Sequence, residues 1–120
     1  MTIIEDLVAA HNEIREGRNL TTLVSNPLLT TFAQQWAETM AGNQRLRHSN
    51  MRDISALGFK RVGENIAMGA GTVEAVMRMW MRSPGHRRNI LSPGFTDIGC
   101  GYADSGNGRS YWCVCFGVPK

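Results

Sequence analysis

No apolar run in the 120-residue sequence approaches the roughly 20 residues that are needed to cross a bilayer, so no transmembrane segment is expected. No segment repeats at a fixed period, which excludes a solenoid. Cysteine is scarce, and its three copies do not form the two C-x-x-C pairs of a zinc ribbon. No arginine run alternates with aromatic residues as in single-strand binders, so no nucleic-acid partner is expected.

What is present indicates one folded domain spanning residues 1–120. The apolar share is 42%, with three Trp and four Phe, enough to build one modest core and to exclude a disordered chain. The net charge is +3, and arginine dominates it. A basic surface facing an anionic partner is one interpretation, and a solvated face with a few internal ion pairs is the other. The arginines concerned are Arg45, Arg47, Arg52, Arg61, Arg87 and Arg88.

The order of the expected elements favours an α+β fold. Capping residues open three helices: Thr2 with Glu5 before 3–17, Asn26 with Pro27 before 27–42, and Thr72 before 73–81. The break at 83–85 starts a short helix over 86–91. Two strands follow, at 96–103 and 109–118, joined by a glycine-rich hairpin turn. Helices come early and an antiparallel hairpin comes late, which argues against a wound parallel sheet.

Two stretches of the chain lack a regular pattern. The acidic start, residues 1–6, has no long apolar stretch, so no signal peptide is expected in this chain. Residues 43–70 show no sustained hydrophobic period, and we expect an irregular segment there. So long an irregular segment in a small domain is more often functional than idle. It contains His48 and Glu64.

The cysteines allow two interpretations. Cys113 and Cys115 are two positions apart on a strand, so they share a face and cannot easily bridge each other. Cys100 lies on the other strand of the hairpin, where a disulfide to Cys113 or to Cys115 could form in an oxidising compartment. The alternative is three reduced, buried thiols that behave as small apolar side chains.

Two histidines and one acid are the candidates for chemistry. His48 and His86 lie in irregular or helix-breaking regions, and two imidazoles with one carboxylate and water make an open zinc site. The same three residues could form a plain hydrogen-bonded cluster, and no H-E-x-x-H motif places two ligands on one helix. We expect Ser49, Asn65 and Ser83 to line the same site. His11, on the first helix, is interpreted as a structural histidine.

These residues fall within motifs that follow one another in a fixed order. The motifs cover nearly the whole chain, and the blocks around Glu64 and His86 are specific. They are Ala10-His11-Asn12-x-x-Arg15, Trp36-Ala37, His48-Ser49, Gly63-Glu64-Asn65-Ile66-Ala67, Trp80-x-x-Ser83-Pro84-Gly85-His86-Arg87-x-Asn89-Ile90-Leu91 and Ile98-Gly99-x-Gly101, with Tyr111-Trp112 and Phe116-Gly117 at the end.

In this order the motifs resemble the CAP superfamily in its short bacterial form, whose relatives include cysteine-rich secretory proteins, venom allergens and class 1 pathogenesis-related proteins. The resemblance implies an α-β-α sandwich with a small antiparallel sheet and a surface cleft. It also implies that His48, His86 and Glu64 are cleft residues, where several family members bind zinc or another divalent cation. The family's second cleft acid is absent here, because its position is Ser83.

The resemblance does not fix one activity, since a fold alone does not define function. The first hypothesis is a non-catalytic binding protein, extracellular or particle-associated, that holds a divalent cation and an anionic envelope component or lipid. The second is a metal-dependent hydrolase or protease, with a metal-bound water and Glu64 as general base. The third is a structural component of a virion or secreted assembly. We expect a monomer or a part of such an assembly.

Overall fold

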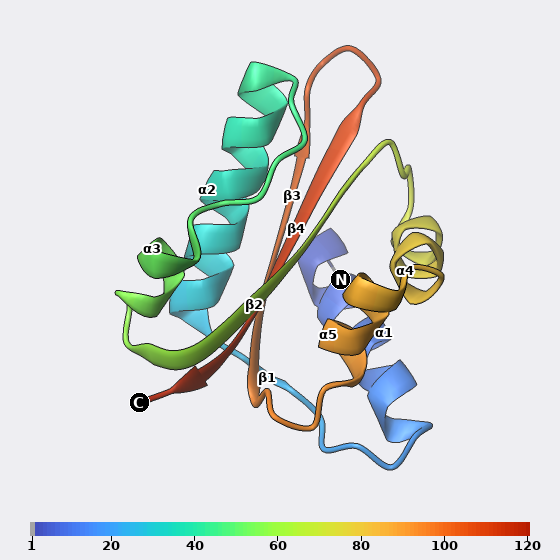
Figure 1. Cartoon of the computed structure of the whole chain (residues 1–120). Helices are drawn as coiled ribbons and strands as arrows, with labels where there is room; N and C mark the ends of the chain where they lie inside the picture. Colours follow the sequence, from blue (N-terminus) through green and yellow to red (C-terminus); the bar gives the residue numbers. More distant parts are fainter. Residues whose placement is uncertain (1) are drawn as a thin grey trace.

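The computed structural model describes residues 2–120 and has three layers, with a four-stranded sheet between two groups of helices (Figure 1). The helices are α1 (Ile3–Glu16), α2 (Pro27–Asn43), α3 (Met51–Ser55), α4 (Val73–Met81) and α5 (Pro84–Leu91). One group is α2 and α3, and the other is α1, α4 and α5. The strands are β1 (Val24–Ser25), β2 (Phe59–Met68), β3 (Asp97–Asp104) and β4 (Ser110–Pro119). The expected α-β-α sandwich is confirmed.

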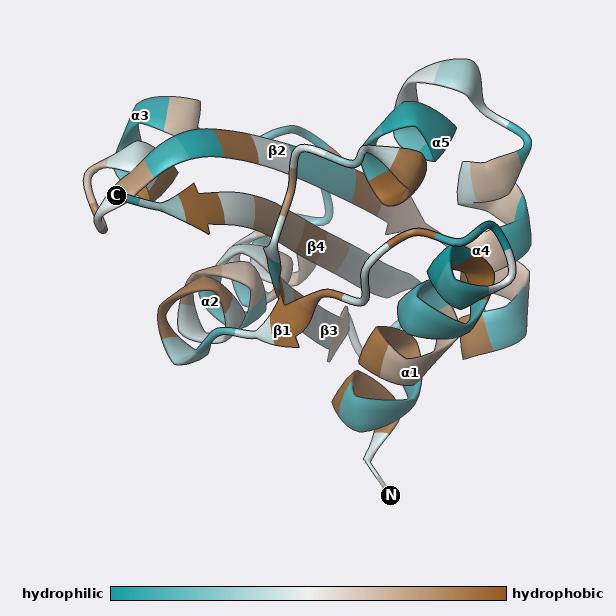
Figure 2. Cartoon of the chain, turned by 90° about the horizontal axis from the view of Figure 1, so that it is seen from below, coloured by the Kyte–Doolittle hydropathy of each residue, from teal (hydrophilic) through white to brown (hydrophobic). Residues whose placement is uncertain are grey.

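The sheet has the order β1-β3-β4-β2, so β2 is an edge strand. β3 and β4 form the expected hairpin, and β2 pairs antiparallel with β4 along its length. β1 adds a short parallel pairing to β3. Seen from below, the same two groups of helices flank the sheet, and much of the ribbon of β4 is hydrophobic (Figure 2). This agrees with the burial of nearly every residue of β4.

The predicted helix starts are confirmed. Thr2 and Glu5 form a reciprocal capping box, and Asn26 and Thr72 each accept a backbone N–H of the helix that they open. The second helix runs one residue past the expected Gly42 and ends at a left-handed Gln44. The short helix begins at Pro84, earlier than expected, since proline is favoured in the first turn.

The prediction of an irregular segment over 43–70 was wrong for much of its length. The segment contains α3 and the ten-residue strand β2. Strand β2 lacks the alternation of apolar and polar residues that marks a half-buried strand, because helices lie against both of its faces. Residues 64–67 are therefore all buried. Two of these buried residues, Glu64 and Asn65, are polar. Glu64 thus lies on a strand and not on the expected loop.

Two cores lie on the two faces of the sheet. The core facing α1, α4 and α5 contains Trp80, Trp112 and Phe116, and the core facing α2 and α3 contains Tyr111 and Ile66. On β3, a Cβ at Gly99 or Gly101 would clash with the backbone of α2, so these two glycines let α2 pack directly against the strand. Among the described residues, no helix has both the length and the apolar character that a bilayer crossing requires.

The register of the hairpin separates the cysteines. Cys100 pairs with Val114, whereas Gly99 and Gly101 pair with Cys115 and Cys113. Cys100 therefore belongs to the core facing α1 and α4, and the other two belong to the core facing α2. All three are free, buried thiols in this structure, which fits the second of the two interpretations drawn from the sequence.

Candidate functional site around Glu64

The candidate site is built on the edge strand β2, where Glu64 lies buried at the centre of a set of hydrogen-bond donors. Its side chain is fully inaccessible to solvent. Oε1 accepts the backbone N–H of Ser49 at 2.9 Å and lies 2.9 Å from Nδ1 of His48. Oε2 accepts the Ser49 hydroxyl at 2.5 Å and the thiol of Cys113 at 3.8 Å. These four contacts use the acceptor sites that a carboxylate offers.

His48 lies on the segment before α3 and is positioned by Glu64. Its side chain is 57% exposed, although Nδ1 is held by the buried carboxylate. Because a carboxylate only accepts hydrogen bonds, Nδ1 carries the hydrogen and Nε2 keeps its lone pair in the neutral ring. A histidine oriented in this way through one nitrogen is typical of metal ligands, which bind through the other.

His86 reaches the site from the other face of β2. It lies in the first turn of α5, where its Nδ1 is 2.9 Å from the Ser83 hydroxyl. Burial is the main cause that lowers the pKa of His86, and the charge of nearby His48 lowers it further. A lowered pKa favours the neutral ring, which is the form that binds metals.

Asparagines connect α5 to β2. The Asn65 amide donates to the backbone carbonyl of His86 at 3.0 Å, and Asn89 donates to the Asn65 side chain at 2.9 Å. Asn89 also approaches the carbonyl of Glu64 at 3.4 Å. Asn65 thus fixes the turn that carries His86, and Asn89 is a positioning residue that the sequence analysis did not single out.

The surface beside His48 is hollow and basic. A hollow of about 370 Å³ is lined by Trp36, Arg47, His48, Ser49, Asn50 and Asp53. The guanidinium of Arg47 lies 5.4 Å from the centre of the Trp36 ring. All six arginines named in the sequence analysis are exposed, and within residues 2–120 the one ion-pair contact joins His48 to Glu64.

A second set of ligand-type atoms lies beneath Glu64, and the sequence analysis missed it. The carboxylate and the thiols of Cys113 and Cys115 have ligand atoms that all lie within 4.8 Å of one another, so this group could hold a metal ion. Only the pairing of β2 with β4, which sets Glu64 against Cys115, brings these residues together. No sequence motif indicates that pairing.

His11 is structural, as its position on the first helix predicted. It is fully buried, its Nδ1 lies 2.8 Å from the Leu7 carbonyl, and its ring lies near those of Trp80 and Phe116. Burial lowers its pKa to about 4, so the ring is neutral in the folded chain near pH 7.

Comparison with known proteins agrees with this fold. The chain is 35% identical over 109 residues to the uncharacterized protein YkwD of Bacillus subtilis (strain 168), covering 84% of this chain and 42% of YkwD. It is 34% identical over 92 residues to a pathogenesis-related protein of PR-1 type from Sambucus nigra, covering 74% of this chain and 48% of that protein. The chain thus spans less than half the length of either relative.

Solved structures share the fold. An outer surface protein of Borrelia burgdorferi superposes with a TM-score of 0.89 at 23% identity, covering 97% of this chain and 92% of that chain. An extracellular protein containing an SCP domain from Bacillus anthracis has a TM-score of 0.84 at 25% identity, with coverages of 95% and 39%. NaASP2, crystallised with Zn²⁺, has a TM-score of 0.71 at 15% identity, with coverages of 94% and 77%.

The family model of the cysteine-rich secretory proteins matches residues 8–116, which include every element from most of α1 to most of β4. That match covers the strand, loop and helix that carry Glu64, His48 and His86. The resemblance drawn from the sequence motifs is therefore confirmed, and the chain belongs to the cysteine-rich secretory protein family, CAP.

Proposed function

We propose that this chain is a non-catalytic binding module, extracellular or particle-associated, whose cleft holds a divalent cation and an anionic or lipid-like envelope component. The observation that carries the proposal is the orientation of the two imidazoles. Nδ1 of His48 contacts the Glu64 carboxylate, which only accepts hydrogen bonds, so Nε2 of His48 keeps its lone pair for a ligand. Nδ1 of His86 lies 2.9 Å from the Ser83 hydroxyl, and Nε2 of His86 is a ligand atom when that hydroxyl accepts the hydrogen bond.

Zinc is the first candidate cation for this cleft. Imidazole nitrogen is a common zinc ligand, and the donor set of two histidines beside one carboxylate suits that metal. A cation bound there would supply positive charge that attracts an anionic group of the partner. The family likeness to NaASP2, which was crystallised with Zn²⁺, supports the choice of metal to be tested first.

The arginine-rich surface supports an anionic partner. Arg47 borders the hollow beside His48, and Arg87 and Arg88 follow His86 on α5. These guanidinium groups are exposed, and none of them makes an ion pair among residues 2–120. Exposed arginines offer paired N–H donors to phosphate or carboxylate groups, which fits an envelope polymer or a lipid headgroup.

Binding is favoured over hydrolysis because of the surroundings of Glu64. A general base must reach a water with a free oxygen lone pair. Both oxygens of Glu64 are already occupied by two donors each, and the side chain is shielded from solvent. Glu64 is thereby suited to position His48, and the hydrolase hypothesis loses its base.

Calorimetric titration with Zn²⁺ near neutral pH tests the proposal. We expect micromolar or tighter binding to the folded wild-type chain, and its loss on the time scale of the titration in the His48→Ala/His86→Ala double variant. Arg18→Ala, an exposed substitution in the turn after α1, is the matched control and retains binding. If the wild-type chain binds no zinc in its folded form, the three residues are a hydrogen-bonded cluster and the structural role becomes the better hypothesis.

A further inference from the structure

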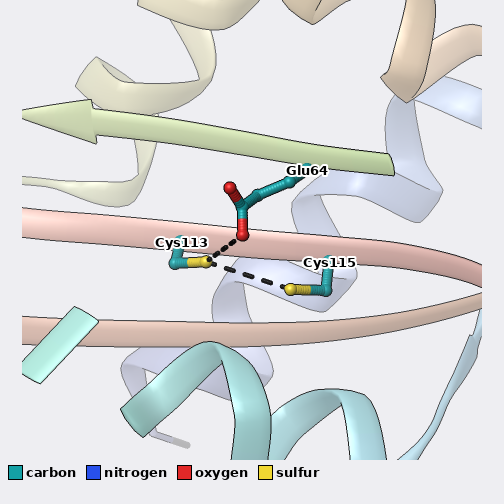
Figure 3. A group of neighbouring side chains, drawn as sticks. All are labelled: Glu64, Cys113 and Cys115. Carbon is teal, nitrogen blue, oxygen red and sulfur yellow. Dashed lines mark hydrogen bonds between the residues drawn. The ribbon is translucent and has the colours of Figure 1, made fainter. Parts of the chain in front are cut away.

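Two thiols and a carboxylate converge inside the layer between the sheet and α2. Cys113 and Cys115 project from the same face of β4, and Glu64 reaches them from β2 (Figure 3). The sulfurs lie 3.9 Å apart, and the Cys113 sulfur lies 3.8 Å from Oε2 of Glu64. Both cysteines are fully buried.

These separations match the edges of a metal coordination polyhedron. Two metal–sulfur bonds of about 2.3 Å span about 3.8 Å at a tetrahedral angle and about 4.0 Å at a trigonal angle. The observed sulfur separation of 3.9 Å lies between these values. Thiolate sulfur selects soft metals, chiefly Zn²⁺ and Cu⁺, and one carboxylate oxygen completes a three-ligand set.

Cys100 provides the internal comparison. It is equally buried, but it lies on the opposite face of the sheet among apolar side chains such as Trp80 and Val114. It therefore behaves as a small apolar residue. Cys113 and Cys115 differ from it in facing a buried carboxylate as well as each other.

We propose that Glu64, Cys113 and Cys115 form a second cation site beneath the histidine cleft. The two cysteine thiolates make this site selective for a soft cation. The site uses Oε2 of Glu64 and the two sulfurs, whereas the cleft uses the outward nitrogens of His48 and His86. On binding, each thiol releases its proton to the buffer and no electron is transferred. The inference does not rest on the function proposed for the cleft.

Access to this site runs through Ser49. The hydroxyl of Ser49 holds Oε2, and His48 beside it is exposed, so a cation reaches the sulfurs when this hydrogen bond opens. Binding to the folded chain is then slow, and binding during refolding is fast. The experiment therefore adds the cation during refolding as well as afterwards.

Titration of the reduced chain with Cd²⁺ under anaerobic conditions tests the site through ultraviolet thiolate-to-cadmium charge-transfer absorbance. We expect saturation at one equivalent in the wild-type chain and at least a tenfold loss of the signal in Cys113→Ala and in Cys115→Ala. Cys100→Ala is the matched control and keeps the full signal. The His48→Ala/His86→Ala variant also keeps the full charge-transfer signal, which distinguishes this site from the histidine cleft.

X-ray absorption of the wild-type zinc complex gives a test that needs no variant. We expect two sulfur neighbours of zinc at about 2.3 Å. A shell of nitrogen and oxygen alone would overturn the second site while supporting a cation in the histidine cleft. Absence of charge transfer in wild type refolded with Cd²⁺, or its persistence in Cys113→Ala/Cys115→Ala, would also overturn it.

Discussion

The two faces of the sheet bury polar groups in different ways. On the face covered by α1, α4 and α5, three buried side chains bond to backbone carbonyls: Arg15 to three of them, and Trp80 and Trp112 to one each. On the face covered by α2 and α3, Glu64 bonds mostly to other side chains. Backbone partners fix a fold, whereas side-chain partners can be exchanged for a ligand.

This difference separates stability from function in one small domain. A carbonyl that loses its buried donor cannot find another without moving a helix or loop, so such contacts are costly to remove. The partners of Glu64 include the exposed His48 and a serine hydroxyl, which can rotate. We therefore expect substitutions on the first face to act on folding and those on the second to act on binding.

The largest effect is expected for Arg15→Met. Arg15 is 1% exposed and donates to the carbonyls of Thr21, Ile90 and Ser92, which ties α1 to the end of α5. Methionine keeps the apolar volume but leaves these carbonyls without their donor. The free energy of unfolding should fall by about 4 kcal/mol, measured by urea denaturation. Arg18→Met, on the exposed side of the same region, should change it by less than about 0.5 kcal/mol. Similar losses of unfolding free energy in both variants would contradict the structural role assigned to the hydrogen bonds of Arg15.

The next effect is the pH dependence contributed by His11. Its pKa falls from 6.5 to about 4 on folding, mainly through burial. Between these two pH values, His11 binds a proton in the unfolded chain but not in the folded chain. The stability that the neutral ring contributes is therefore fully present above about pH 6.5 and is lost as the pH falls toward 4. The loss amounts to about 3 kcal/mol. Urea denaturation of the wild-type chain and of His11→Leu should give a shallower pH slope for the variant in this window. Equal slopes would show that His11 is not buried in its neutral form.

The sequence predicted the helices better than the edge strand β2, and the reason is physical. Thr2, Asn26 and Thr72 are local caps, so the helices that they open can be predicted from neighbouring residues. Strand β2 could not be predicted in this way, since its buried Glu64 and Asn65 interrupt the hydrophobic pattern. Their burial becomes favourable only through partners more than ten residues away.

The candidate site shows the same contrast between residues that local motifs identify and contacts that depend on distant parts of the chain. The residue types of His48, Glu64 and His86, together with the resemblance of their motifs to a known family, are enough to single these residues out. They give no indication that Cys113 and Cys115 lie under Glu64, because that contact depends on the register between β2 and β4. A shift of one residue in that register would turn both thiols to the other face of the sheet.

The smallest effect, and the sharpest test of the comparison, is expected for Ser49→Ala. The substitution removes one donor to Oε2 of Glu64 but leaves the Ser49 backbone N–H, His48 and Cys113 in place. Because Oε2 still accepts the Cys113 thiol, the free energy of unfolding should fall by only about 1 kcal/mol. Ser25→Ala, at an exposed strand position, is the control and should have no measurable effect.

The same variant should act more strongly on binding than on folding. Without the serine hydroxyl, Oε2 is free to turn toward the two sulfurs, so Cd²⁺ should enter the folded chain faster than it enters the wild-type chain. Stopped-flow absorbance of the thiolate–cadmium signal measures this rate directly. A large loss of stability with no change in the rate of cadmium entry would place Ser49 with Arg15 as a structural residue. The proposed difference between the two faces of the sheet would then not hold at Ser49.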